Sequence, residues 1–203
     1  MVNHLHQGDL PDDLDLGPVV AVDSETMGLI PHRDRLCLVQ MSAGDGDVHL
    51  VQVSQNQTAA PNMTRMLANP DQLKLFHFGR FDIAVLERCF GVRTSPVYCT
   101  KIASKLVRTF TDRHGLKNLC QELLGIDISK QQQSSDWGAE ELAQDQISYA
   151  ASDVLYLHAI REILDTRLAR ESRTDIAQAI FDFLPTRAAL DLMGWPDTDI
   201  FMH

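Results

Sequence analysis

The stretch that decides the fold runs from residue 18 to residue 25 and reads Pro18-Val19-Val20-Ala21-Val22-Asp23-Ser24-Glu25. A short β-branched run that starts at a proline is typical of a buried β-strand. Asp23 and Glu25 follow where that strand ends. Side chains at positions i and i+2 of a strand point to the same face, so we expect the two carboxylates to project together. Because like charges repel unless a cation lies between them, the pair is a candidate metal site, although a solvated strand end has the same pattern.

Strand-like segments on either side of this stretch predict the rest of a sheet. Residues 35–42 and 47–53 are apolar runs, and Gly44-Asp45-Gly46 between them favours a hairpin turn. The first three strands are therefore expected to pair as a meander. Strand–helix alternation and then helices follow, which predicts an α/β domain with a five-stranded mixed sheet flanked by helices. The expected strands are residues 19–22, 35–42, 47–53, 73–78 and 97–99, and the expected helices are about 61–67, 81–90, 100–109, 115–124, 139–145, 146–170 and 173–191.

Length and composition predict a single globular domain over residues 1–203. The chain has 203 residues, of which 44% are hydrophobic and 23% are charged. Residues 1–17 contain several Asp but no Lys or Arg, and we expect them to form an acidic N-terminal arm. Residues 172–203 are too apolar for a free tail, and we expect this extension to pack on the domain or on a neighbouring subunit.

Charge and cysteine usage limit the partners of the chain. Its formal net charge is −10, which disfavours a broad nucleic-acid surface because such surfaces need many Lys and Arg contacts. The chain therefore either does not bind nucleic acid or takes a short piece at a local site. No secretory signal, no spanning apolar run and no paired cysteine motif are found, so we expect a soluble, cytoplasmic protein with reduced thiols and no membrane partner.

Two further motifs add carboxylates to the first pair. Tyr149 and Asp153 stand four residues apart in a predicted helix, and Asp82 follows a predicted strand-to-helix junction. Alone, each has a structural explanation, either helix packing or a favourable acid in the first turn. With Asp23 and Glu25 they supply oxygen ligands only, which suits Mg²⁺ or Mn²⁺. Two such ions about 4 Å apart perform in-line displacement at phosphorus, and they also make an acidic pocket attractive to phosphate.

The three motifs together resemble those of the DEDDy exonucleases, the ribonuclease D group. The resemblance covers roughly residues 18–170 and implies the ribonuclease H-like exonuclease fold. A closer resemblance, to the compact nano-RNase C branch of this group, runs nearly end to end. It implies a 3′-5′ exoribonuclease that cleaves dinucleotides such as pGpG and very short RNA to 5′-mononucleotides, and a ring-shaped homo-oligomer such as an octamer. The segments that carry the resemblance are residues 22–26, 77–82, 149–153, 32–37, 99–106, 111–117, 129–137 and 194–195.

The resemblance also implies roles for the motif residues. Asp23, Glu25, Asp82 and Asp153 would hold two divalent cations, Mg²⁺ or Mn²⁺. Tyr149 would orient the attacking water, since a phenol with an ordinary pKa of about 10 is a poor base at neutral pH.

Substrate contacts are expected from residues in or near the motifs. Leu29 would wedge between two bases, with a place in the core as the alternative. The other candidates would contact the bases or cap a 5′-phosphate, but surface charge, a core histidine or simple packing explains several of them equally well. These candidates are Thr26, His77, Arg80, Lys101, Ser135 and Trp137.

Two alternative functions remain open at this stage. A broader 3′-5′ exonuclease would trim longer RNA or DNA ends, which the acidic charge disfavours. A catalytically inactive family member would serve as an RNA-binding scaffold, which the complete set of motif residues disfavours. Metal binding separates the second alternative from an enzyme, because a scaffold has little reason to keep two sites for hard cations.

Overall fold

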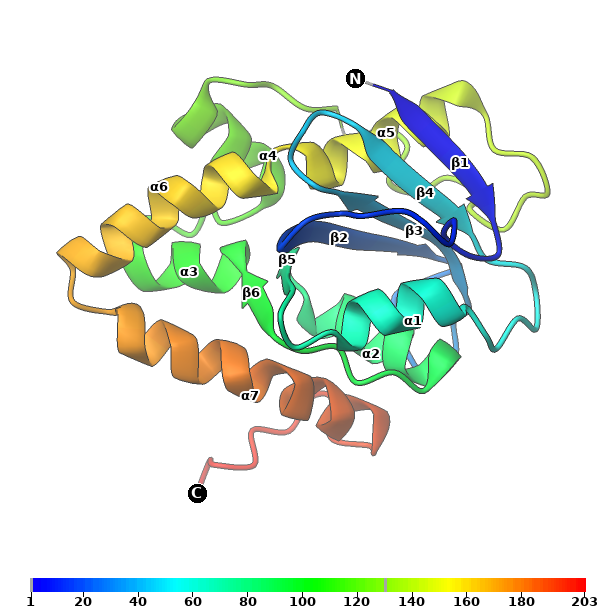
Figure 1. The fold of residues 1–203 in the computed structure, drawn as a ribbon. Helices are drawn as coiled ribbons and strands as arrows, with labels where there is room; N and C mark the ends of the chain where they lie inside the picture. Colours follow the sequence, from blue (N-terminus) through cyan, green and yellow to red (C-terminus); the bar gives the residue numbers. More distant parts are fainter. Residues whose placement is uncertain (1, 130) are drawn as a thin grey trace.

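The computed structural model describes residues 2–129 and 131–203 and contains a six-stranded mixed sheet (Figure 1). Met1, in the predicted arm, and Lys130, in one of the matching segments, lie outside the described residues. The strand order is β1-β4-β3-β2-β5-β6. The strands are β1 (Asn3–Gln7), β2 (Val19–Thr26), β3 (Leu36–Ser42), β4 (Val48–Gln52), β5 (Leu73–Phe76) and β6 (Val97–Cys99).

The predicted meander is confirmed. β2 pairs antiparallel with β3, and β3 pairs antiparallel with β4 across the turn that contains Gly44 and Gly46. β5 and β6 then extend the sheet in parallel from β2. Every residue of β3 is buried, which explains why this strand is an almost continuous apolar run without strict alternation.

The sheet has one strand more than the sequence predicts. β1 pairs in parallel with β4, so residues 3–7 are not part of a loose arm. The prediction missed this strand because Asn3–Gln7 is polar and contains two histidines, whereas an edge strand is held by backbone hydrogen bonds that the side chains do not reveal.

Helices cover both faces of the sheet, with α5 on one side and α1 and α2 on the other (Figure 1). α3 packs against α6. The helices are α1 (Pro61–Ala68), α2 (Arg80–Phe90), α3 (Thr100–Val107), α4 (Leu116–Leu119) continued by η1 (Cys120–Leu124), α5 (Gln144–Leu155), α6 (Leu157–Arg170) and α7 (Thr174–Leu192).

Two helix predictions were wrong. Residues 139–145 do not form a separate helix, because the amide of Gln52 donates hydrogen bonds to the carbonyls of Ala139 and Glu140 and holds this segment as a loop. Residues 146–170 are not one helix but two, since α5 ends at Leu155 and α6 begins at Leu157.

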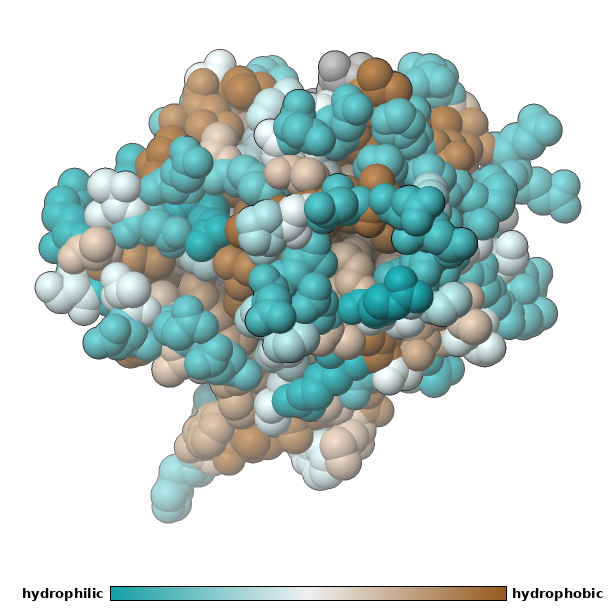
Figure 2. All heavy atoms as spheres, viewed as in Figure 1, coloured by the Kyte–Doolittle hydropathy of each residue, from teal (hydrophilic) through white to brown (hydrophobic). Residues whose placement is uncertain are grey.

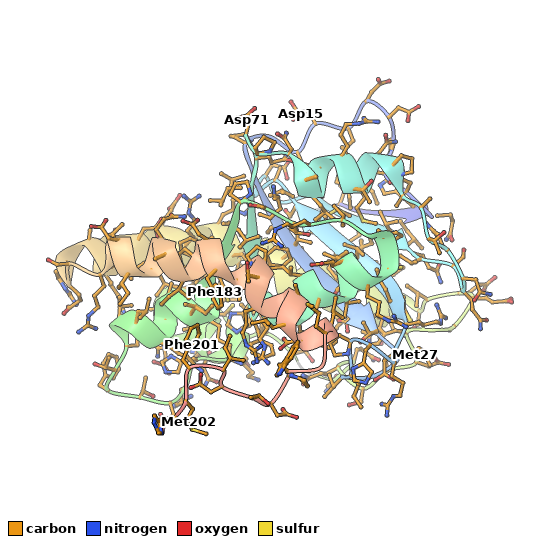
Figure 3. All side chains as sticks on the ribbon, turned by 90° about the horizontal axis from the view of Figure 1, so that it is seen from below. Asp15, Met27, Asp71, Phe183, Phe201 and Met202 are labelled. Carbon is orange, nitrogen blue, oxygen red and sulfur yellow. The ribbon has the colours of Figure 1, made fainter. Side chains whose placement is uncertain are left out.

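The C-terminal segment combines a packed helix with an exposed apolar end. α7 lies against α2 and β6, and hydrophobic residues gather on the face of the molecule where α7 lies (Figure 2). Beyond α7 the chain folds back so that the rings of Phe183 and Phe201 lie 6.2 Å apart, on the same side of the molecule as Met202 (Figure 3). Phe201 and Met202 are 79% and 77% exposed. Among the described residues, no helix is both long and apolar enough to cross a membrane.

Candidate active site

Three elements bring the predicted carboxylates together. The end of β2 carries Asp23 and Glu25, the first turn of α2 carries Asp82, and α5 carries Asp153. Oxygen atoms of Asp23, Glu25 and Asp153 all lie within 4.8 Å of one another. All four residues line one cavity of about 510 Å³. The clustering of the acidic motifs that the sequence predicts is therefore present in the structure.

Neighbouring side chains hold two of these carboxylates in place. Gln40 is opposite Asp23 in the β2–β3 register, and its amide donates a hydrogen bond of 2.9 Å to Asp23 Oδ2. The Ser24 hydroxyl donates a hydrogen bond of 2.6 Å to Asp82 Oδ1. Gln40 and Ser24 are both buried, so their hydrogen bonds fix the two carboxylates in one orientation.

A tight turn between β5 and α2 places Asp82. Phe78 adopts the left-handed conformation with a φ of 70°, and Gly79 follows it directly. A side chain at Gly79 is excluded, because its Cβ would lie 2.6 Å from the Cβ of Phe76. The turn therefore starts α2 at Arg80 and puts Asp82 in the first helical turn, where the helix dipole favours an acid.

The crowded carboxylates are strongly perturbed. Burial, followed by repulsion from Asp153 and Asp82, raises the pKa of Glu25 to about 9. Burial also raises the pKa of Asp82 to about 7, against the opposing effect of the hydrogen bond from Ser24. Burial and the same kind of repulsion raise the pKa of Asp23 well above its ordinary value. Groups that resist ionisation in the protein alone are ionised readily beside a cation, so this all-oxygen set fits a hard divalent ion.

Tyr149 lies one turn before Asp153 on α5 and lines the same cavity. Burial, followed by the charges of Asp153 and Glu25, raises its pKa above the ordinary value. The raised pKa favours the neutral phenol at physiological pH. Its ring lies 6.0 Å from that of Trp137, and the loop of Trp137 is tied to α5 by a hydrogen bond from Gln146 to the Asp136 carbonyl.

Five of the predicted substrate contacts line this cavity. Leu29 is 85% exposed at its edge, so the alternative of a core position is wrong. His77 accepts or donates a hydrogen bond of 2.9 Å with the Thr100 hydroxyl, and Trp137 is 3% exposed. The five residues are Thr26, Leu29, His77, Ser135 and Trp137.

The other two predicted contacts lie beside the cavity. The Lys101 ammonium stands 4.1 Å from the centre of the Phe78 ring, and Phe78 lines the cavity. Arg80 does not line this cavity, and its guanidinium binds both carboxylate oxygens of Asp191 and the carbonyl of Pro196. This ion pair joins α2 to α7, and a contact between Arg80 and a substrate stays a prediction.

Sequence reasoning missed several residues that line or support the cavity. Gln40 supports Asp23 from β3, but no short turn joins β2 to β3 and their register shifts after Glu25, so the pairing cannot be counted from the sequence. Ser24 stands between the two acids, but no pattern shows that its hydroxyl reaches α2. Phe78 lies in the segment 77–82 that carries the resemblance, but its left-handed backbone, which is rare for a bulky residue, has no sequence signal. Gln133 and Ser134 also line the cavity.

Comparison with known proteins agrees with this geometry. A family model described as 3′-5′ exonuclease matches residues 9–169. The chain belongs to the 3′-5′ exonuclease family. Ribonuclease D of Acidiphilium cryptum is 36% identical over 166 residues, which cover 82% of this chain and 42% of that relative. Ribonuclease D of Gluconacetobacter diazotrophicus is 34% identical over 158 residues, with 78% of this chain and 40% of the relative covered. The chain thus spans less than half the length of these relatives.

Solved structures match over the whole chain. Brucella melitensis NrnC with bound Mg²⁺ has 55% identity and a TM-score of 0.96, and 100% of each chain is covered. Brucella melitensis NrnC bound to pGG has 56% identity and a TM-score of 0.97, covering 100% of this chain and 99% of the other. Escherichia coli RNase D, at 23% identity and a TM-score of 0.73, shares the fold. The predicted ribonuclease H-like exonuclease fold and the resemblance to nano-RNase C are confirmed.

Proposed function

We propose that this chain is a 3′-5′ exoribonuclease that hydrolyses dinucleotides and very short RNA, such as pGpG, to 5′-mononucleotides. The observation that carries the proposal is the carboxylate cluster in one cavity, within a chain that matches a pGG-bound NrnC over its whole length. A compact cavity of about 510 Å³ accommodates a short substrate end more readily than a long folded RNA.

In this proposal Asp23, Glu25, Asp82 and Asp153 hold two divalent cations, Mg²⁺ or Mn²⁺. The donor set supports it, because the four side chains offer oxygen only and are too crowded to be ionised together without a cation. When bound, the ions would activate the attacking water and stabilise the leaving 3′-oxygen. Gln40 and Ser24 would keep Asp23 and Asp82 in position.

The neutral phenol of Tyr149 would orient the water that attacks the last phosphodiester. In the reaction a bond forms between the water oxygen and phosphorus, the bond from phosphorus to the 3′-oxygen breaks, and that oxygen gains a proton. The product is a 5′-mononucleotide. The position of Tyr149 in the cavity, one helical turn before Asp153, supports this role.

Residues at the cavity edge would select the substrate. Leu29, the most exposed of them, is proposed to insert between the two bases. Thr26, His77, Ser135 and Trp137 would contact the terminal nucleotide from the cavity wall. Lys101 and Arg80, which lie beside the cavity, would bind the 5′-phosphate. Arg80 would then have to bind the phosphate and Asp191 at the same time.

A broader 3′-5′ exonuclease is the second candidate. It is favoured by the similarity to ribonuclease D, which reaches 36% identity over 82% of this chain. In that case the cavity would be the closed end of a channel along which longer RNA or DNA is fed.

The C-terminal segment is proposed to join copies of the chain into a ring-shaped homo-oligomer such as an octamer. Support comes from the large apolar side chains that α7 and the residues after it leave exposed, including Met193, Phe201 and Met202.

A cytoplasmic location is also proposed. It is supported by the four cysteines, which are free thiols, namely Cys37, Cys89, Cys99 and Cys120.

A substrate length series tests the proposal. The purified chain with Mg²⁺ or Mn²⁺ is given 5′-phosphorylated RNAs of two to about ten nucleotides, and Asp23→Asn serves as the inactive control. Rapid cleavage of the dinucleotide with a steep fall at three or more nucleotides is the expected result. Similar rates at every length would favour the broader exonuclease, and no metal-dependent hydrolysis at any length would overturn both candidates.

A further inference from the structure

Three histidines form a cluster at the edge of the sheet, on strands that carry none of the predicted site residues. His4 and His6 belong to β1, and His49 belongs to β4, beside it (Figure 1). His4 is directly opposite His49 in the parallel register, and His6 is two residues further along β1. Because side chains alternate along a strand, all three imidazoles stand on the same face of the sheet.

The imidazole rings are close and nearly parallel. The centroid of the His49 ring lies 4.7 Å from that of His4 and 5.2 Å from that of His6, and the His4 and His6 centroids lie 6.5 Å apart. His6 Nε2 and His49 Nδ1 are 3.0 Å apart and share a hydrogen bond. His4 Nε2 lies 3.4 Å from a carboxylate oxygen of Asp47, the residue that precedes β4. Three imidazoles and one carboxylate therefore lie close together where β1 pairs with β4.

The electrostatics of the cluster favour the neutral forms of His6 and His49. Burial, followed by repulsion from His4, lowers the pKa of His6. Burial and the repulsion of His4 and His6 also lower the pKa of His49, against the attraction of Asp45 and Asp47. A neutral imidazole keeps a lone pair on one ring nitrogen, which is the form that binds a metal ion.

We propose that His4, His6 and His49, together with Asp47, form a binding site for a late divalent transition-metal ion such as Zn²⁺. Imidazole nitrogen with one carboxylate is a donor set that Zn²⁺ accepts in tetrahedral geometry, and it differs from the all-oxygen set of the carboxylate cavity. Two ligands at i and i+2 of one strand and a third on the adjacent strand, about 4.8 Å away, can approach one ion from three directions.

Binding requires a rearrangement of the side chains. The polar atoms now form two pairs, His6 with His49 and His4 with Asp47, so the imidazoles must turn about their side-chain bonds to face one ion. Binding would break the hydrogen bond between His6 and His49, and the ring that donates it would turn or carry its N–H on the other ring nitrogen, so that each neutral imidazole presents a lone pair to the ion. The bound ion would link the short edge strand β1 to β4 and so stabilise their pairing.

Calorimetric titration of the tag-free full chain with Zn²⁺ tests the proposal, with excess Mg²⁺ present to compete at the carboxylate cavity. We expect the wild-type chain to bind one Zn²⁺ per chain and its melting temperature to rise. His49→Gln should weaken Zn²⁺ binding by about tenfold or more, because loss of even a supporting residue of a metal site typically costs that much. His203→Gln, which removes an exposed histidine outside the cluster, is the matched control and should bind as the wild type does.

Two outcomes would overturn the site. One is a wild-type chain that binds no Zn²⁺ under these conditions, and the other is a His49→Gln variant that binds Zn²⁺ as tightly as the control. Should His49→Gln fail to fold, His6→Gln on the edge strand decides the question in the same way. Hydrolysis of a dinucleotide with Mg²⁺ should be unchanged in these variants, so the result is independent of the proposed exonuclease activity.

Discussion

The floor and the rim of the candidate active site are built in opposite ways. The floor consists of Asp23, Glu25, Asp82 and Asp153, which are carried by packed elements of secondary structure and lie in the cavity. The rim consists of Met27, Leu29 and Phe78, whose side chains are 52%, 85% and 47% exposed. The floor is rigid because two of its carboxylates are held by buried hydrogen-bond donors, whereas the rim stands on loop residues. Chemistry is therefore expected to depend on the floor, and substrate choice on the rim.

The largest effect is expected from a change in the floor. Asp23→Asn removes one charge from the cluster without changing the size of the side chain. Because a bound cation contributes several kcal/mol of transition-state stabilisation, dinucleotide hydrolysis should fall about 1,000-fold or more. Initial rates with saturating Mg²⁺ measure the loss. A variant that keeps a tenth of the wild-type rate would contradict the role of the floor.

Tyr149→Phe removes only a hydroxyl group from the cavity. The rate should fall by about 10- to 100-fold through misplacement of the attacking water, while Mg²⁺ affinity stays the same. Parallel rate and calorimetric measurements separate the two effects. An unchanged rate would contradict the proposal that Tyr149 orients the attacking water. A large loss of Mg²⁺ affinity would place the phenol in the metal site instead.

Ser24→Ala tests whether the support beneath the floor matters. Without the hydroxyl that binds Asp82, activity or Mg²⁺ affinity should fall by about tenfold. Ser42→Ala is the matched control, since Ser42 is also a buried serine on the adjacent strand, but its hydroxyl binds the carbonyl of Asp47. Equal losses in the two variants would show a general effect of removing a buried hydroxyl.

Leu29→Ala changes the rim and should leave the floor intact. We expect KM for a dinucleotide to rise a few-fold, kcat to change little and stability to stay within about 0.5 kcal/mol of the wild type. Leu5→Ala, an exposed leucine on β1, is the control and should change neither constant. A fall in kcat without a change in KM would mean that the rim takes part in the chemistry.

A separate prediction concerns the pH dependence of stability without metal. The pKa of Glu25 rises from 4.5 to about 9 on folding, so between these values the folded chain holds a proton that the unfolded chain has lost. Stability from this group is therefore present at low pH and is lost as the pH rises toward 9. Each kcal/mol corresponds to about 2–4 °C in melting temperature for a chain of this size.

Melting curves in a chelator and in Mg²⁺ check this dependence. The melting temperature in the chelator should fall toward high pH, and Mg²⁺ should raise it most where the carboxylates are ionised. Glu25→Gln should flatten the curve in the chelator. A wild-type curve with the same slope as the Glu25→Gln curve would contradict the assignment to this residue.

The floor was predictable from the sequence, whereas the rim and its support were predictable only in part. Strand alternation and helical spacing determine the face on which each of these side chains lies, so local rules predict their positions. The residues are Asp23, Glu25, Asp82, Tyr149 and Asp153. The Ser24–Asp82 hydrogen bond spans 58 residues and has no local signal. Strand β1 escaped prediction for a related reason, because its partner β4 lies far along the chain and its own side chains are polar.

Anomalous scattering from crystals of the chain soaked in Mn²⁺ tests the central claim most directly. The claim is that the floor holds two hard divalent cations. We predict two Mn²⁺ peaks about 4 Å apart, within coordination distance of Asp23, Glu25, Asp82 and Asp153. An absence of Mn²⁺ from the floor at concentrations that support hydrolysis, or Mn²⁺ bound only elsewhere on the chain, would contradict it.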